Sequence, residues 1–149
     1  MTPRLVVVCG LPGSGKTTLA VALQKELRGI RLSPDDWMTA LKLDLWDEPT
    51  RGRIEEMQRG LARDLLDHGV NVIVEFGSWK RSERDELRAI AAASGAAYEL
   101  RYLDLPIDEL HRRITDRGRE DPPITIDNLR EWAALIEAPT AEELSLNDA

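Results

Sequence analysis

The stretch Gly10-Leu11-Pro12-Gly13-Ser14-Gly15-Lys16-Thr17 decides how this chain folds. It fits the pattern G-x-x-x-x-G-K-[ST], and the apolar run at residues 5–9 leads directly into it. After it, leucines recur every four residues, at Leu19, Leu23 and Leu27, which is the spacing of one helix face. A strand, a glycine-rich loop and a helix in this order predict a loop whose backbone N–H groups surround a phosphate.

This loop is expected to bind the triphosphate of a nucleotide. The helix that begins near Gly15 adds its positive N-terminal end to the same place. Lys16 is predicted to reach the β- and γ-phosphates, and the hydroxyl of Thr17 to ligate Mg²⁺. The predicted nucleotide contacts in the loop are Gly10, Leu11, Pro12, Gly13, Ser14, Gly15, Lys16, Thr17 and Thr18.

Length and charge narrow the class of protein. A chain of 149 residues suits a single domain spanning residues 1–149, with enough residues for a hydrophobic core. Its 27 acidic and 20 basic residues leave a net charge of −7. Such a field repels nucleic acids and anionic membranes in bulk, although a local basic groove remains open. We therefore expect a small-molecule partner and no membrane partner.

The single cysteine, Cys9, falls in the apolar run and is expected to be a buried thiol. One cysteine forms no internal disulfide, which suits a reducing cytoplasm. The N-terminal apolar run is too short for a signal peptide, and no segment approaches membrane-spanning length. These features favour a cytoplasmic protein.

Strands alternate with helices along the chain, which predicts an α/β fold with a mostly parallel sheet covered on both faces. The predicted strands are at residues 4–9, 29–32, 70–74 and 98–103. The first predicted helix follows the loop and ends at residue 28, and the second carries the apolar stripe Ile54, Met57, Leu61 and Leu65 and ends at residues 68–69. The third begins with a capping box at Ser82 and Asp85 and ends near residue 95. Two more helices are predicted, one that begins at Pro106 and one at residues 127–136. Residues 37–50 and the acidic tail from residue 137 carry no clear pattern, and a fifth strand is not evident.

Three acids fall where parallel strands are predicted to end. Ligands gather at that edge of such sheets. Asp35 is the candidate general base that takes the proton of an acceptor hydroxyl, and Asp36 is either structural or a second contact. Ser33 or Asp35 is also suited to cap a helix that contains Trp37. Glu75 either holds a Mg²⁺-bound water or an acceptor hydroxyl, or is an ordinary loop acid.

The helix from Pro106 carries three arginines. At 100° per residue Arg113 and Arg117 lie on one side, beside its apolar stripe, whereas Arg112 points away. Arginines at the edge of a buried face are suited to offset the charge of a transferring phosphate. Arg119 follows in the glycine- and proline-containing segment 118–123. We expect a lid at about residues 110–123, with Arg117 as its catalytic member.

The acceptor side is less clearly marked. Trp37, Trp46 and Trp79 flank the predicted acids and could stack on an acceptor, although packing is the simpler role for each, and Trp132 falls in an apolar helical pattern typical of a core. Arg81 and Arg84 are candidates to contact an anionic acceptor.

At these residues the chain resembles the compact P-loop kinases, small ATP-binding kinases of the AAA type that include the polynucleotide kinase domain, chloramphenicol phosphotransferase and zeta-toxin kinases. The resemblance spans Leu5 to about Glu137 and includes the loop 10–17. The segment 33–37 (Ser-Pro-Asp-Asp-Trp) resembles the one that supplies the general base, and 113–118 (Arg-Ile-Thr-Asp-Arg-Gly) resembles the lid. Residues 72–75 (Val-Ile-Val-Glu) look like the zeta-toxin pattern, in which the glutamate helps to place the acceptor.

The resemblance implies a three-layer α/β/α fold with strand order 2-3-1-4 and Mg·ATP as phosphate donor. It places the base on Asp35 and the phosphate contact on Arg117. The sequence thus predicts a kinase that transfers the γ-phosphate of ATP to a hydroxyl of a small molecule. A polynucleotide 5′-hydroxyl kinase and a nucleotide-dependent switch remain the alternatives.

Overall fold

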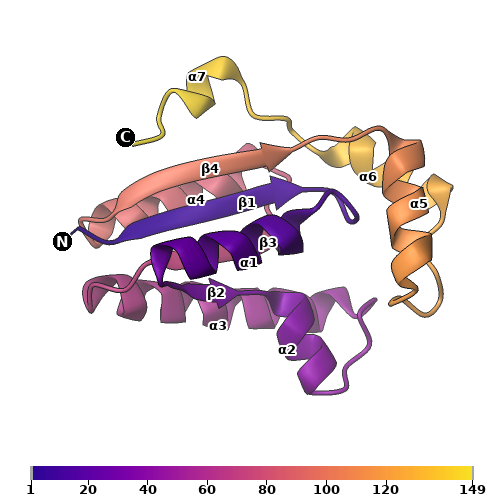
Figure 1. The fold of residues 1–149 in the computed structure, drawn as a ribbon, viewed down its shortest axis with the longest axis horizontal. Helices are drawn as coiled ribbons and strands as arrows, with labels where there is room; N and C mark the ends of the chain where they lie inside the picture. The colour runs from indigo at the N-terminus through magenta and orange to yellow at the C-terminus, as the bar shows by residue number, and fades with distance from the viewer. Residues whose placement is uncertain (1, 149) are drawn as a thin grey trace.

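The computed structural model describes residues 2–148 as a parallel sheet with helices on both faces (Figure 1). Its elements are β1 (Arg4–Gly10), α1 (Lys16–Leu27), β2 (Ile30–Leu32), α2 (Pro34–Ala40), α3 (Glu48–Asp67), β3 (Val72–Gly77), α4 (Arg81–Ala93), β4 (Ala97–Leu103), α5 (Ile107–Arg117), α6 (Ile126–Leu135) and α7 (Ala141–Leu144).

The four strands have the order β2-β3-β1-β4, and each neighbouring pair is parallel. This confirms the predicted α/β fold and strand order. Side chains of β1 alternate between the two faces of the sheet, so that both faces are apolar. Leu5 and Val7 pack with α3 and α4 on one face, whereas Val6 and Val8 pack with α1 on the other. The result is a three-layer α/β/α arrangement.

The helix α3 begins earlier and faces differently than its leucine pattern predicts. It starts at Glu48, inside the segment that has no clear pattern, and the side chain of Asp47 caps it by accepting the backbone N–H of Thr50 at 3.1 Å. Its buried face consists of Ile54, Gln58, Ala62 and Leu66, and Met57 is 64% exposed. The predicted stripe was therefore wrong at Met57, because a buried glutamine hides the true face from an apolar pattern.

Two other element boundaries differ from the prediction. The strand β3 continues past Glu75 to Gly77, because its pairing with β1 extends to Cys9 opposite Gly77. The helix α4 starts at Arg81, and its capping contact is the carboxylate of Glu83, which accepts the backbone N–H of Lys80 at 3.2 Å. The predicted capping box at Ser82 is therefore wrong, since Ser82 already lies within the helix.

The C-terminal segment occupies the outer edge of β4. The backbone N–H of Asp148 donates to the carbonyl of Tyr98 at 2.8 Å, and the side chain of Asn147 both accepts from and donates to the backbone of Leu100. Through residue 148 the sheet has four strands, and these contacts satisfy the edge that a fifth strand would cover. Among the described residues, no helix is long and apolar enough to cross a membrane.

The helix α7 is tied to α4 by a buried ion pair. Arg84, 1% exposed, donates to both carboxylate oxygens of Glu143, at 2.6 and 2.8 Å. Its remaining donor reaches the carbonyls of Ser78 and Trp79 at 3.0 and 3.1 Å. Arg84 therefore holds the turn after β3 and is not available to an acceptor, which corrects its predicted role.

Removing one partner of this pair leaves the other charge buried and unpaired. We expect Glu143→Ala to lower the free energy of unfolding by roughly 3 kcal/mol. The neighbouring Glu142→Ala is the control, because Glu142 is 72% exposed and makes one contact with Arg81, and its loss should cost under about 1 kcal/mol. Urea unfolding measures both values, and similar small losses would contradict the structural role of the pair.

Candidate functional site

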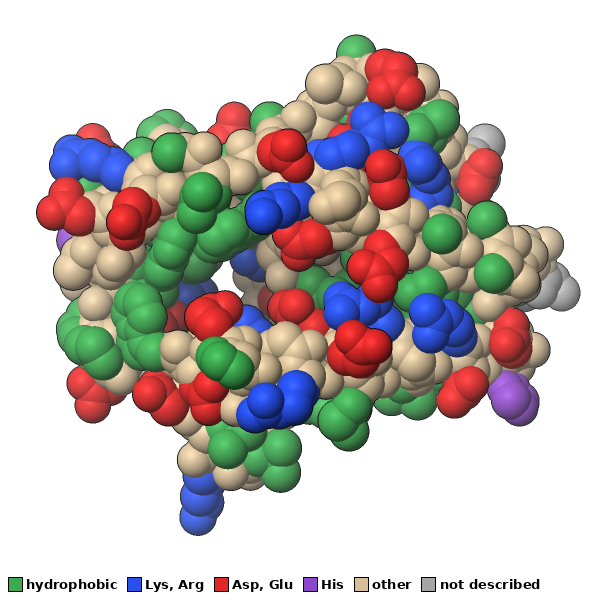
Figure 2. Space-filling model, turned by 180° about the vertical axis from the view of Figure 1, so that it is seen from behind, with side chains coloured by type: hydrophobic (Ala, Val, Ile, Leu, Met, Phe, Trp, Pro, Cys, Tyr) green, Lys and Arg blue, Asp and Glu red, His purple; other side chains and the backbone are tan. Residues whose placement is uncertain are grey.

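A cavity of about 770 Å³ opens at the carboxyl ends of β1 and β3. The loop 10–17, the start of α2, the turn after β3, and helices α3, α5 and α6 contribute to its walls. Figure 2 shows the hollow from behind, with hydrophobic side chains along one rim and charged side chains on the other. Because parallel strands end together at this edge, segments far apart in the sequence meet here.

Glycines shape the loop because no other residue fits there. Gly13 and Gly15 have positive φ angles of 83° and 97°, a backbone region that favours glycine. A Cβ at Gly13 would lie 2.8 Å from the carbonyl oxygen of Leu110, so helix α5 rests directly against the loop. Helix α1 then begins at Lys16, and its N-terminal N–H groups face the cavity end of the sheet.

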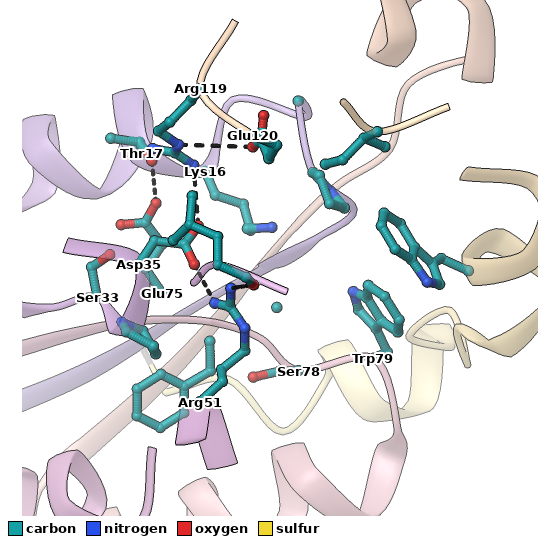
Figure 3. A pocket seen from close by; sticks show the side chains of 18 of the residues that line it. Lys16, Thr17, Ser33, Asp35, Arg51, Glu75, Ser78, Trp79, Arg119 and Glu120 are labelled. Atoms are coloured by element: carbon teal, nitrogen blue, oxygen red, sulfur yellow. Dashed lines mark hydrogen bonds and ion pairs between the residues drawn. The ribbon is translucent and has the colours of Figure 1, made fainter. Parts of the chain in front are cut away.

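Lys16 and Thr17 are the first two residues of α1. The ammonium of Lys16 donates to the carbonyl of Gly10 at 2.8 Å. Burial lowers the pKa of Lys16 to about 8, although the carboxylates of Glu75 and Asp35 act in the opposite direction. The hydroxyl of Thr17 donates to the carboxylate of Glu75 (Figure 3). The buried ammonium of Lys16 therefore lies near the paired Thr17 hydroxyl and Glu75 carboxylate, and a bound anion would stabilise its charged form.

Glu75 is the buried acid of the site, 8% exposed. Its second carboxylate oxygen accepts from Arg31 at 2.5 Å. Arg31 also pairs with Asp36, which is exposed and is not among the residues that line the cavity. The structure thus places Glu75 at the cavity, as predicted, and gives Asp36 a pairing role outside it.

Asp35 lies in the first turn of α2, behind the cap in which Ser33 accepts the N–H of Asp36 at 3.3 Å. Two arginines bind its carboxylate: Arg51 of α3, and Arg119, whose donor lies 3.1 Å away. In Figure 3 they approach Asp35 from below and above. Burial alone would raise the pKa of Asp35, but Arg51 first and Arg119 next lower it below its usual value. The carboxylate is therefore ionised and fixed in orientation.

The arginines of α5 divide as their spacing predicts. Arg113 and Arg117 line the cavity, whereas Arg112 does not and pairs with Glu109 at 2.6 Å. Arg113 also pairs with Glu109, at 3.0 Å, and Arg117 pairs with Glu120, at 2.6 Å. Each guanidinium group that could meet a phosphate is held near the loop by a carboxylate.

An aromatic wall closes the side away from α1. The indole rings of Trp46 and Trp79 each lie against Trp132, with centroids 6.0 and 5.8 Å apart. All three rings line the cavity, and all three are half-buried and pack against the hydrophobic cluster that contains Leu110 and Leu129. Trp132 therefore packs at the edge of the core, as its apolar helical pattern predicts, and also forms part of the cavity wall. Trp37 is half-buried in α2 but does not line the cavity.

Arg81 is also placed differently from its predicted role. It pairs with Asp85 at 2.9 Å and with Glu142 at 3.2 Å, and it is not among the cavity-lining residues. The position after Trp79 predicted a contact with an acceptor, but the first turn of α4 directs this side chain toward its own helix and toward α7.

A family described as an AAA domain matches residues 5–139, which is most of the chain. The chain belongs to this family. The L-seryl-tRNA(Sec) kinase of Methanococcus maripaludis is 28% identical over 132 residues, which cover 85% of this chain and 51% of that protein. A probable gluconokinase of Schizosaccharomyces pombe is 29% identical, over 92% of this chain and 74% of that protein.

The fold of this AAA domain also occurs in solved structures. A chain of the Pnkp1/Rnl/Hen1 RNA repair complex superposes with a TM-score of 0.70 at 24% identity, over 90% of this chain and 44% of that chain. The predicted resemblance to compact P-loop kinases is thereby confirmed. The domain spans about half the length of the seryl-tRNA kinase relative.

Sequence reasoning missed Arg51, Arg31 and Glu55. Arg51 directly follows the unassigned segment 37–50, Arg31 lies in a short strand, and Glu55 lies on α3 outside its apolar stripe. Glu55 lines the cavity, and no hydrogen bond or ion pair with another described residue fixes its carboxylate. Burial raises the pKa of Glu55 to about 7; Arg59 and Arg51 oppose this shift, whereas Glu83 and Glu48 add to it.

An acid whose pKa rises on folding destabilises the native state once it ionises. For Glu55 this cost is absent well below pH 4.5 and complete above pH 7. We therefore expect the stability advantage of Glu55→Gln over the unmodified protein to grow between pH 5 and pH 8, by up to about 2 kcal/mol. Urea unfolding at the two pH values measures it.

The control for this prediction is Glu56→Gln on the same helix, because the Glu56 side chain is 83% exposed. Its effect on stability should be the same at both pH values. An equally flat response of Glu55→Gln would show that the Glu55 carboxylate is solvated.

Proposed function

We propose that this domain transfers the γ-phosphate of Mg·ATP to a hydroxyl group of a small molecule. The observation that carries the proposal is the position of Asp35, whose carboxylate lines the same cavity as the loop 10–17. A phosphate donor held by the loop and an acceptor held against Asp35 would thus share one cavity. The kinase names of two relatives, L-seryl-tRNA(Sec) kinase and probable gluconokinase, support the reaction type.

In the proposed mechanism the loop amides and Lys16 hold the β- and γ-phosphates. Arg117 and Arg113 leave their carboxylate partners to meet the transferring phosphate. The acceptor oxygen forms a bond to the γ-phosphorus, the bond to the β,γ-bridging oxygen breaks, and ADP leaves. The hydroxyl proton passes to Asp35, which the two arginines keep ionised and oriented.

The oxygen groups beside the loop fit a magnesium ion. Thr17 and Glu75 place a hydroxyl and a carboxylate together next to the phosphate-binding loop, and Mg²⁺ prefers oxygen ligands. Thr17 would hold the ion directly, and Glu75 would hold it through a water molecule. When bound, Mg²⁺ neutralises charge on the β- and γ-phosphate oxygens.

We further propose that residues 1–149 act as one domain with a lid at about residues 110–123. The pairing of Arg119 with Asp35 joins this segment to α2 across the cavity. Breaking the contact between Arg119 and Asp35 would open the cavity to an acceptor. Re-forming it after the acceptor has bound would exclude water from the site.

A nucleic acid is the second candidate acceptor. The observations in its favour are the seryl-tRNA kinase relative and the likeness to a chain of an RNA repair complex. The net charge of −7 argues against it. Binding to an oligonucleotide with a free 5′-hydroxyl should be weak and only slightly salt-dependent if the small-molecule proposal holds, because few phosphates would be neutralised.

The removal of the base tests the mechanism. We expect Asp35→Asn to bind ATP normally and to lose transfer by about 10² to 10⁴, because it no longer accepts the hydroxyl proton. Transfer of label from γ-labelled ATP to pooled metabolites and oligonucleotides measures the activity, with Asp36→Asn as the matched control. Full transfer by the Asp35 variant would refute its role, and nucleotide-dependent partner capture without labelled product would favour a switch.

The pKa of Lys16 yields a separate prediction for the nucleotide. Since that pKa is about 8, the ammonium is lost as the pH rises through this value. ATP should therefore bind several-fold more weakly at pH 9 than at pH 7.5, as measured by calorimetry. Lys16→Ala should bind ATP weakly at both pH values; an unchanged ATP affinity in this variant would contradict phosphate binding at the loop.

A further inference from the structure

The cavity has two chemically different halves. The phosphate half is built by the loop and by the arginines of α5 and the segment after it. We call the part of the lining that Trp46, Glu55, Phe76, Trp79 and Trp132 form the acceptor half. If the proposed function holds, whatever receives the phosphate lies against this half, so its chemistry selects the acceptor.

The acceptor half offers no uncommitted cation among the described residues. Arg51 at its border pairs with Asp35 and donates to the carbonyl of Leu45 at 2.7 Å. Arg59, whose guanidinium lies 6.0 Å from the ring centroid of Phe76, pairs with Glu86 at 3.5 Å. An acceptor that carried a carboxylate, sulfate or phosphate group would therefore have to displace an existing ion pair.

Glu55 presents the opposite situation. Its carboxylate is half-buried, lines the cavity, and makes no hydrogen bond or ion pair with another described residue. The nearby guanidinium groups of Arg59 and Arg51 offset part of its charge, but neither forms an ion pair with it. The carboxylates of Glu83 and Glu48 oppose the two arginines, and both also line the cavity. A partly desolvated carboxylate without a partner is costly unless a cation meets it. We therefore expect a cationic group of the acceptor to pair with the Glu55 carboxylate.

The tryptophan wall adds a second preference for positive charge. The three rings of Trp46, Trp79 and Trp132 form a continuous surface along the cavity. The faces of indole rings attract cations and also cover apolar groups. In Figure 3 the ring of Trp79 points into the cavity from the side opposite Asp35. An acceptor that fits both features combines an ammonium group with an apolar body.

We propose that the phosphate acceptor is an amino alcohol: a hydroxyl compound with a protonated amine that pairs with Glu55 and an apolar portion that packs on the tryptophan wall. This inference rests on the proposed function, and it excludes the acidic sugars, sulfonucleotides and nucleic acids as preferred acceptors. The hydroxyl faces Asp35, and the amine and the apolar portion determine which alcohol is chosen.

Three compounds with the same phenylpropanoid skeleton test the charge preference. Phenylalaninol carries an ammonium group, N-acetylphenylalaninol is neutral, and 3-phenyllactate is an anion, and each retains a hydroxyl. Their dissociation constants follow from the change in tryptophan fluorescence at pH 7.5. We expect phenylalaninol to bind at least tenfold more tightly than 3-phenyllactate, with the neutral compound between them.

The variant Glu55→Gln should weaken phenylalaninol binding about tenfold and leave N-acetylphenylalaninol unchanged. Glu56→Gln, on the exposed side of α3, should alter neither. Equal or tighter binding of the anion, no effect of Glu55→Gln, or no binding of any of the three at millimolar concentration would overturn the proposal. ATP binding and its dependence on Lys16 are measured separately, so failure here is distinct from failure of the kinase assignment.

Discussion

The parallel pairing of β1 with β3 is the constraint on which the site depends. It aligns Leu5 with Val72 and Val7 with Val74, and it ends with Cys9 opposite Gly77. Both strands are buried on both faces, so their register is set by the hydrophobic layers on either side. As a consequence, the phosphate-binding loop after β1 and Glu75 near the end of β3 come together. A shift of one residue would turn Glu75 into the core.

Paired charges organise the cavity that this edge creates. Asp35 binds Arg51 and Arg119, Glu75 binds Arg31 and Thr17, and Arg117 binds Glu120. Each pair keeps its members oriented and partly desolvated. A triphosphate would compete for the arginines, whereas Arg51 would stay with Asp35 because both lie on helices of the fixed scaffold. The ion pairs thus keep Arg117 and Arg119 close to the loop at which a triphosphate would bind.

The C-terminal segment supports the acceptor half from outside. Glu143 holds Arg84, Arg84 holds the carbonyls of Ser78 and Trp79, and the N–H of Glu137 donates to the same Trp79 carbonyl at 2.8 Å. The Cys9 thiol donates to the carbonyl of Ser78 at 3.1 Å, and burial raises its pKa to about 11. The turn that carries Trp79 is therefore anchored on several sides, which suits a wall that must keep its shape.

The sequence alone determined the strand–loop–helix unit at residues 4–27, the parallel α/β class and the position of Asp35 after the second strand, because each has a local signal in spacing or apolar periodicity. The partners of Asp35 lie 16 and 84 residues away, and no local pattern marks such pairs. Only the tertiary structure decided that Arg51 and Arg119 meet there, that Arg84 is buried, and that Glu55 lines the same cavity as the tryptophan wall. These outcomes depend on how helices dock on the sheet, and docking is set by the packing of the whole core.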